Sequence, residues 1–332
     1  MPLSRFLGTG LAVPDRVVTN DDLSQLMDTS DQWIRERTGI RERRWVREGE
    51  TGGQLALAAS GRALEAASLA PAEVEAIVYA SSTPDHFAPG NGVYLQRELG
   101  AGPIPAIDIR TQCSGFVYAL AVADAFIRIG TYQRVLVVGA EALSTMLEYS
   151  DRGRDMAVLF ADGAGAVVLQ SVDGSSRSGF ISHHLHQDGT VLDKLFGEIY
   201  GSSTYPIVSK KKIDEGRARP TMNGRAIFSQ AVRRFKEVMR EALTANDLTP
   251  DDVDFFLFHQ ANQRILDAIA EYAKIPEHKM FNNVHKYGNT SAASVPICIH
   301  EAYTAGRIRE GDLVLTAAFG AGFAWGASLF RW

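Results

Sequence analysis

The stretch LAPAEVEAIVYA at residues 69–80 has a counterpart in LTPDDVDFFLFH at residues 248–259. Both pass from a leucine through a proline and acidic residues into a short apolar run that is typical of a buried strand. Cys113 stands some way beyond the first stretch, and Asn289 stands at the matching place beyond the second. A duplication of this kind predicts two similar folding units. It also predicts that Cys113 and Asn289 occupy equivalent points, where one site between the units uses both.

The duplication divides the chain into two expected halves. The first half, residues 1–175, carries a candidate cysteine nucleophile, and the second, residues 176–332, carries a histidine and an asparagine. The stretch 193–220 interrupts the repeated pattern, because it is rich in glycine, proline, serine and lysine. Such a composition indicates a long irregular excursion at the surface.

Apolar strand-like runs alternate with amphipathic segments along the chain, which predicts an α/β layered architecture. Strands are predicted at 76–79, 104–109, 135–138, 164–169, 255–258, 313–317 and 327–330. Helices are predicted at 54–67 and 227–244, and the second carries a basic face that includes Arg233 and Arg234. We expect that face to be either a solvated helix surface or a docking surface for an acidic partner.

Size and composition exclude several classes of protein. The chain has 332 residues, 45% of them hydrophobic, and a net charge of -5, so it can bury a large core and is poorly suited to nucleic acid. No apolar run reaches membrane-spanning length, and the first residues show no secretion signal. Only two cysteines are present, so we expect a cytoplasmic protein without disulfides. The stretch HHLH at 183–186 lacks partners at ligand spacing, so we expect no metal site.

Cys113 follows a strand-like run and precedes a helical one. The free N–H groups and the dipole of a helix N-terminus favour the thiolate, which is the nucleophilic form. The alternative is a small buried cysteine that only packs. That is our interpretation of Cys298, which lies in the apolar segment VPICI at 295–299.

His259 ends a strand-like run, at the edge where open α/β sheets bind their ligands. The alternative for His259 is a core histidine, and for Asn289 a turn residue after glycine. We expect Cys113, His259 and Asn289 each to stand at a strand-to-helix junction, and the duplication to bring the three side chains to one site. A cysteine with two neutral donors suits thioester chemistry, since the sulfur takes an acyl group and the donors stabilise an enolate oxygen. A glycine-rich turn such as AFGAGFAWG at 318–326 lets backbone N–H groups approach an oxyanion closely. The alternative is an ordinary structural turn, since glycine turns are common.

Six tracts, in order along the chain, carry a resemblance to a known family. They are TSDQWI with RTGIR (29–34 and 37–41), CSGF (113–116), SDRG (150–153), HQAN (259–262), GNTSAAS (288–294) and the glycine-rich turn at 320–326. In these tracts the chain resembles β-ketoacyl-acyl-carrier-protein synthase III, a condensing enzyme with the thiolase fold, from end to end. The resemblance implies a five-layered α-β-α-β-α fold built by internal duplication, a homodimer, and no cofactor.

The resemblance also implies a ping-pong decarboxylative condensation. An acyl-coenzyme A loads Cys113, and coenzyme A leaves. A malonyl thioester, expected as malonyl-acyl carrier protein, then loses carbon dioxide and attacks the acyl-cysteine to give a 3-oxoacyl thioester. His259 and Asn289 stabilise the enolate, and the N–H groups of Cys113 and Ala321 hold the acyl oxyanion.

Further binding residues follow from the same resemblance. Coenzyme A is expected to meet Trp33, Arg37, Arg152, Gly224 and Asn262, with Trp33 and Arg152 flanking its adenine. Phe87 is expected to close the acyl pocket, of its own subunit or of the neighbour. The acidic carrier protein is expected to meet Arg264, Arg233 and Arg234.

Some features depart from the family's initiating enzymes. Arg110, Thr111 and Gln112 precede the cysteine where small residues are usual, as in branches of secondary metabolism that include quinolone-forming synthases. Ala321 stands where glycine is usual, and the excursion at 193–220 is long. One alternative is therefore a secondary-metabolism enzyme that condenses or transfers an unusual acyl group to another acceptor. Others are acyl transfer to oxygen or nitrogen, and a non-catalytic partner that binds acyl carriers.

Overall fold

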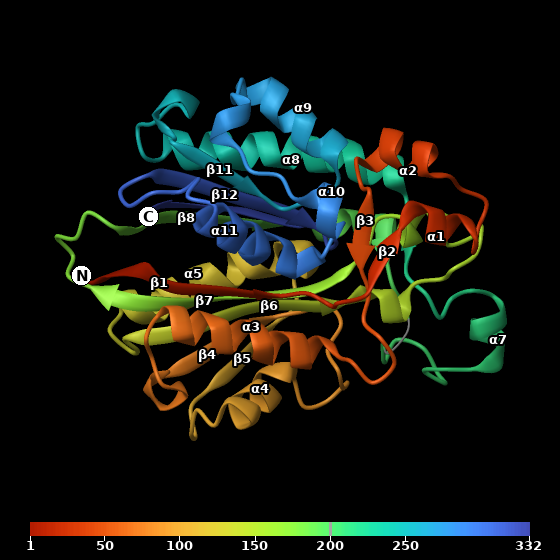
Figure 1. Cartoon of the computed structure of the whole chain (residues 1–332), viewed down its shortest axis with the longest axis horizontal. Coiled ribbons are helices and arrows are strands. Elements are labelled where there is room, and N and C mark those ends of the chain that lie inside the picture. The colour runs from red at the N-terminus through yellow and green to blue at the C-terminus, as the bar shows by residue number, and fades with distance from the viewer. Residues whose placement is uncertain (199–200) are drawn as a thin grey trace.

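The structure, a computed structural model, describes residues 1–198 and 201–332 and contains two main sheets (Figure 1). The first sheet has the strand order β1-β7-β6-β4-β5. Its strands are β1 (Leu3–Ala12), β7 (Asp162–Val172), β6 (Arg134–Ala142), β4 (Ala76–Ala80) and β5 (Ala106–Ile109). Strand β4 runs parallel to both β5 and β6. The C-terminal ends of these three strands therefore lie on the same side of the sheet, next to Cys113.

The second sheet has the strand order β11-β12-β13-β8. Its strands are β11 (Phe255–Phe258), β12 (Leu313–Gly320), β13 (Ala324–Arg331) and β8 (Gly179–Gln187). All the strands predicted from apolar runs are confirmed, whereas β1 and β8 are the two strands of the main sheets that the sequence does not predict. In β1 the apolar pattern is interrupted by Gly8 and Gly10, where the helix Gly52–Ala66 packs too closely for a side chain, and in β8 it is interrupted by histidines.

Helices cover and separate the two sheets in the five layers that were predicted (Figure 1). The outer layers are α3 (Gly52–Ala66) with α4 (Asn91–Leu99), and α8 (Gly224–Thr244) with α9 (Gln263–Ala273). The central layer is α5 (Gly115–Arg128) with α11 (Ser294–Thr304), which pack between the sheets. Among the described helices, none has the length and apolar character that a bilayer span requires.

Helix capping explains why two predicted helices begin early. The Thr51 side chain accepts a hydrogen bond from the Gln54 N–H, and the Gln54 Oε1 accepts one from the Thr51 N–H, so α3 starts at Gly52. Likewise, the Asn223 side chain accepts from the Ala226 N–H and starts α8 three residues before its apolar pattern begins.

The remaining elements are short. They are β2 (Val17–Thr19), β3 (Glu42–Arg44), α1 (Asn20–Ser24), α2 (Asp31–Thr38), α6 (Arg154–Ala157) and α10 (Val284–Tyr287), with the 3-10 turns η1 (Pro71–Glu73), η2 (Gln112–Ser114), η3 (Leu143–Met146), η4 (Gly189–Lys194), η5 (Pro250–Asp252), η6 (Glu277–Lys279) and η7 (Ser291–Ala293). Turns η1 and η5 precede β4 and β11 at the repeated stretches, as expected for a duplication. The division at residue 175 falls between β7 and β8 and stays a prediction.

The excursion predicted at 193–220 leaves the body of the molecule between β8 and α8 (Figure 1). Its base is a two-stranded ribbon of β9 (Leu195–Phe196) and β10 (Thr221–Met222), and its far end carries α7 (Lys210–Asp214). Residues 199–200 of the predicted excursion lie outside the described residues.

The predicted equivalence of Cys113 and Asn289 is wrong by three residues. Turns η2 and η7 each begin with a non-glycine residue at positive φ, Gln112 at 46° and Ser291 at 47°, and each leads directly into a central helix. This geometry makes Ala292 the counterpart of Cys113. Asn289 lies before that turn, because the second half approaches its central helix from α10, whereas the first half approaches its own from β5.

Candidate active site

Cys113 is the buried second residue of η2, directly before the N-terminus of α5. The end of β12 passes so close that a Cβ on Gly320 would lie 2.8 Å from the Cys113 nitrogen, so only glycine fits there. The next residue, Ala321, lines a cavity together with Cys113. Ala321 also avoids the left-handed region, since the described non-glycine residues with positive φ are Ser68, Gln112, Asp247, Lys274 and Ser291.

The three predicted catalytic side chains converge. One cavity is lined by Cys113, His259 and Asn289 together with Phe319 and Gly320. The predicted common chamber is therefore present, although its residues come from two halves that are not in strict register.

The position and protonation of His259 follow from its surroundings. It directly follows β11, and its Nδ1 lies 2.6 Å from the Ser294 Oγ, which also accepts a hydrogen bond from the Gln260 N–H at 3.4 Å. A hydroxyl that accepts from Gln260 is free to donate to Nδ1, which leaves the proton on Nε2. Burial lowers the pKa of His259 to about 3, so the ring is a neutral donor throughout the physiological range.

The side chain of Asn289 is also oriented. Its Oδ1 accepts a hydrogen bond of 2.9 Å from the Ser291 N–H, so its amide protons remain available to a substrate. Its backbone N–H donates to the Leu159 carbonyl, and its own carbonyl accepts from the Ala161 N–H, each at 2.9 Å. The prediction of a strand-to-helix junction is wrong here, because Asn289 follows α10 and pairs with Phe160 only through an isolated bridge.

The protonation of Cys113 differs from the sequence prediction of a thiolate. Burial raises the pKa of the Cys113 thiol to about 11, the hydroxyl of Ser291 lowers it in part, and the negative charge of Glu141 raises it further. The α5 N-terminus acts in the opposite direction, but burial penalises the charged sulfur more strongly. Cys113 therefore rests as a neutral thiol.

This protonation state predicts how alkylation depends on pH. Because the pKa is raised, the thiolate fraction grows with pH throughout the neutral and mildly alkaline range. We expect the rate of Cys113 alkylation by iodoacetamide to rise about tenfold per pH unit from about pH 7 to 10. Peptide mass mapping separates Cys113 from Cys298, whose thiol pKa burial raises even further. A plateau of the rate below about pH 8 would show that the helix N-terminus sets the pKa.

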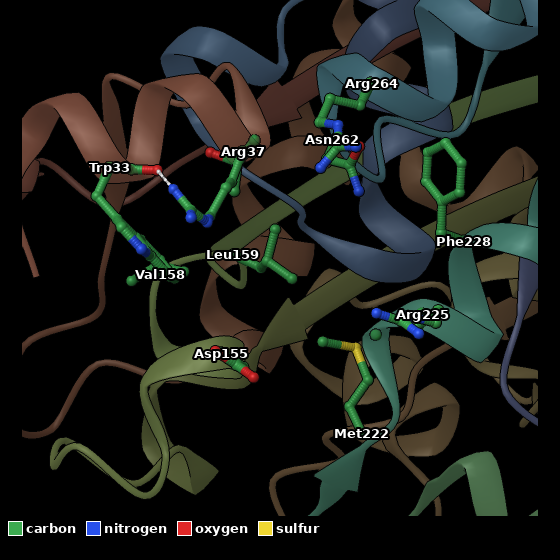
Figure 2. Close-up of a pocket in the computed structure, with 12 residues that line it drawn as sticks. Trp33, Arg37, Asp155, Val158, Leu159, Met222, Arg225, Phe228, Asn262 and Arg264 are labelled. Carbon is green, nitrogen blue, oxygen red and sulfur yellow. Dashed lines mark hydrogen bonds between the residues drawn. The ribbon is translucent and has the colours of Figure 1, made fainter.

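A second cavity of about 450 Å³ opens beside the catalytic one (Figure 2). It is lined by Trp33 and Arg37 of α2, Gly224 of α8, Asn262 before α9 and Arg264 of α9. The two cavities adjoin, because they share the lining residues Leu159, Met222, Gly224, Phe228 and Asn262. They form a route from a basic mouth at the surface to Cys113.

The partner of Trp33 differs from the expected one. Arg152 does not line this cavity; it forms an ion pair of 2.8 Å with Glu148, and its side chain is 60% exposed. Instead, the guanidinium groups of Arg37 and Arg154 lie 4.3 and 4.6 Å from the centre of the Trp33 ring. Two guanidinium groups thus lie against the Trp33 indole. Planar groups of this kind can stack on a planar ligand.

The expected carrier-protein residues are distributed unevenly. Arg264 lines the mouth of the route. Arg234 does not present a free charge, because it pairs with Asp188 at 3.1 Å and Glu237 at 2.8 Å and is only 16% exposed. Arg233 is exposed but also pairs with Glu237, at 2.8 Å. The charges of Arg233 and Arg234 are therefore paired by Glu237 of the same helix and by Asp188, which lies before α8 in the sequence.

Phe87 does not line either cavity that contains Cys113. It is 76% exposed and lines an adjoining cavity beside Pro84 and Asp85, which shares Ser82 and Arg110 with the cavity at Cys113. In the single chain it therefore lies beyond the cavity that Cys113 lines.

Several residues at the site were missed from the sequence. Ser294 orients His259, Arg154 stacks on Trp33, and Arg225 lines the mouth. Glu141 is fully buried near the catalytic cavity and accepts hydrogen bonds from Ser82 and Thr83. Ser294 lies in the tract GNTSAAS and Arg154 directly follows the tract SDRG, so both could have been found from the sequence. Glu141 could not, because an acidic residue near the end of an apolar strand is common and does not by itself indicate a functional site.

Within residues 1–198 and 201–332, no group of three or more His, Cys, Asp and Glu side chains is arranged to hold a metal ion. The histidine-rich stretch instead bonds to protein side chains. His183 contacts Asp124, and His184 and His186 both contact Glu241 of α8.

Comparisons with known proteins agree with this geometry. A family model for 3-oxoacyl-[acyl-carrier-protein] synthase III matches residues 107–189, and the model for the C-terminal part of the same enzyme matches residues 243–332. The β-ketoacyl-[acyl-carrier-protein] synthase III of Alkalilimnicola ehrlichii is 45% identical, with 100% of both chains covered. The crystal structure of the Thermus thermophilus synthase III matches with a TM-score of 0.90 and 41% identity, over 99% of both chains. The priming β-ketosynthase of the R1128 polyketide pathway matches with a TM-score of 0.89 and 33% identity, over 99% of this chain and 96% of that one. This chain belongs to the β-ketoacyl-acyl-carrier-protein synthase III family.

Proposed function

We propose that this protein condenses an acyl group, delivered as acyl-coenzyme A, with a malonyl thioester, with loss of carbon dioxide. The observation that carries the proposal is one buried cavity in which a cysteine faces two oriented, neutral donors. A thiol alone supports acyl transfer. Two donors that cannot act as strong bases favour the stabilisation of an enolate oxygen.

The first step loads Cys113. Its sulfur attacks the thioester carbonyl, a new carbon–sulfur bond forms, the bond to coenzyme A breaks, and the thiol proton passes to the departing sulfur. A resting neutral thiol suits this exchange, since the proton it carries is the one that the leaving group needs. The N–H groups of Cys113 and Ala321 are proposed to hold the oxyanion.

The second step uses the malonyl thioester. Loss of carbon dioxide leaves its electron pair on the α-carbon and the thioester oxygen, where the Nε2 proton of His259 and the amide of Asn289 stabilise it. The carbanion attacks the acyl-cysteine, a carbon–carbon bond forms, and the Cys113 sulfur leaves as a thiolate that takes a proton from water. The product is a 3-oxoacyl thioester.

Binding roles are proposed by position. Trp33, Arg37, Gly224 and Asn262 line the route and are assigned to coenzyme A. Arg152 is retained as an adenine contact, provided that it leaves Glu148 on binding. Arg264 is assigned to an acidic carrier protein that delivers the malonyl group.

The remaining features follow from family membership. We propose a homodimer in the cytoplasm that needs no cofactor. The exposure of Phe87 supports its use by a neighbouring subunit and not by its own.

The proposal predicts two separable signals. Intact-mass measurement with a panel of acyl-coenzyme A thioesters is expected to show one acyl adduct on Cys113. Subsequent malonyl-acyl carrier protein is expected to discharge that adduct and release one carbon dioxide per product. An adduct that discharges to an alcohol or amine without carbon dioxide would instead identify acyl transfer to oxygen or nitrogen.

A second candidate is a synthase of secondary metabolism that takes an unusual acyl group. It is favoured by Arg110, which lines the cavity at Cys113 where the family's initiating enzymes carry a small residue. The same acyl panel separates the two, because an initiating enzyme is expected to load acetyl groups best.

A further inference from the structure

The cavity at Cys113 continues away from the coenzyme A route. A third cavity, of about 160 Å³, is lined by Cys113 and by Leu195, Gly197 and Pro220 of the excursion. Its volume is close to that of a cavity of about 150 Å³ that accommodates benzene. It therefore has room for a short or cyclic acyl group.

This cavity is not closed at its far end. It shares Ser82, Arg110, Met146, Gly197 and Pro220 with the cavity at Phe87. Gly197 and Pro220 come from opposite ends of the excursion, one after β9 and the other before β10. The placement of the excursion therefore sets the width of the passage between the two cavities.

The excursion has little apolar packing to hold it. Tyr205 is 100% exposed, and Ile207, Val208 and Ile213 are 42%, 45% and 53% exposed. The ribbon at its base pairs two residues with two. Hydrophobic burial therefore contributes little to fixing its shape.

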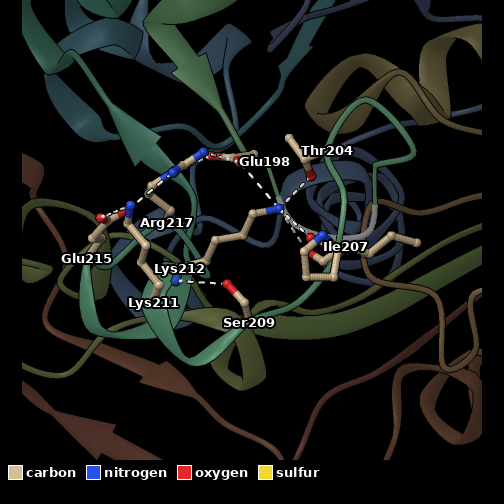
Figure 3. Close-up of polar contacts among 9 residues, drawn as sticks. Glu198, Thr204, Ile207, Ser209, Lys211, Lys212, Glu215 and Arg217 are labelled. Atoms are coloured by element: carbon tan, nitrogen blue, oxygen red, sulfur yellow. Dashed lines mark hydrogen bonds and ion pairs between the residues drawn. The ribbon is translucent and has the colours of Figure 1, made fainter.

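A buried lysine holds the excursion instead (Figure 3). The Lys212 side chain is only 9% exposed, and its Nζ donates to the Thr204 Oγ1 at 2.6 Å and to the carbonyls of Pro206 and Ile207 at 2.8 and 3.2 Å. The three contacts use all three ammonium protons. The lysine thereby ties α7 to the loop at 204–207.

An ion pair connects this lysine to the cavity wall. Glu198, next to Gly197, lies 3.7 Å from the Lys212 Nζ and accepts two hydrogen bonds from Arg217, at 2.7 and 2.6 Å. Arg217 also contacts Glu215 at 3.2 Å (Figure 3). A planar guanidinium that grips a carboxylate at two points fixes orientation as well as distance. We name Glu198, Lys212 and Arg217 the excursion clamp.

We propose that the excursion clamp is a positioning device that sets which acyl chain lengths fit beyond Cys113, by holding Gly197 and Pro220 as a narrow passage. The inference rests on the proposed acyl loading of Cys113. Lys212 contacts no reacting atom, so it acts only by positioning Gly197 and Pro220 in the wall of the cavity at Cys113.

The test compares Lys212→Met with Lys210→Met and Lys211→Met. The two control lysines are neighbours on α7, but their side chains are 86% and 81% exposed and make only i,i+4 pairs. For Lys212→Met we expect the ratio of decanoyl to butyryl loading rates on Cys113 to rise about tenfold, because a widened apolar site discriminates less by length. The controls are expected to keep the wild-type ratio.

A second readout does not depend on catalysis. Alkylation of Cys113 by N-octyl iodoacetamide, relative to iodoacetamide, is expected to accelerate about tenfold in Lys212→Met. If wild type loads no acyl group but this alkylation ratio still rises, the proposed function fails and the clamp stands. If folded Lys212→Met keeps both wild-type ratios, the clamp proposal is overturned. Should Lys212→Met not fold, Thr204→Val removes a single clamp contact and is held to the same two outcomes.

Discussion

Replacing Cys113 by alanine is expected to abolish the acyl-enzyme and to lower condensation by about 10⁴-fold or more, as for the loss of other covalent nucleophiles. Cys113 is the cysteine that lines the cavity shared with His259 and Asn289. Intact mass after incubation with an acyl-coenzyme A measures the adduct, and carbon dioxide release measures the second step. Stability should change little, because the small side chain borders a cavity and not packed core.

Cys298→Ala provides the matched control. This cysteine is also buried, but it lies on α11 in the packed interior, where its sulfur contacts the Phe281 carbonyl. The variant is expected to load acyl groups at the wild-type rate. An adduct that survives in Cys113→Ala and disappears in Cys298→Ala would refute the assignment of the nucleophile.

The second large effect concerns the two donors. His259→Ala and Asn289→Ala are each expected to lower malonyl decarboxylation and condensation about 10²- to 10³-fold, the usual cost of losing one oxyanion donor. Both variants should still form the acyl-cysteine. Neither side chain is needed to ionise the sulfur, and His259 is a poor base because burial lowers its pKa to about 3.

Intact mass and carbon dioxide release, measured on the same samples, separate the two steps. His278→Ala is the control, since His278 is exposed and lines neither of the cavities that contain Cys113. If His259→Ala forms no acyl adduct, His259 also acts as the base for Cys113 and the division of labour is wrong.

Much of the fold follows from local patterns. The runs that became β4 and β11 are short, apolar and repeated, so their strands could be predicted directly. Strand β8 could not, because its histidines read as polar while their partners lie far away in the sequence. The apolar pattern predicts the starts of α3 and α8 too late, because the caps Thr51 and Asn223 begin each helix before its apolar pattern does.

The site was predictable in its residues but not in its electrostatics. Cys113, His259 and Asn289 each belong to a recognisable tract. The pKa of the thiol, by contrast, depends on burial and on Glu141, which the sequence does not place nearby. The neutralisation of Arg234 likewise depends on Asp188, a distant residue that folding brings to α8.

The three-residue offset between Cys113 and Asn289 bears on how such an enzyme can arise from a repeated gene. A symmetric pair of first halves would present two sulfurs and no proton donors, and a pair of second halves would present donors and no sulfur. Neither symmetric pair would hold all three side chains in one place. Only the joining of one half of each kind in a single chain brings Cys113, His259 and Asn289 to one cavity.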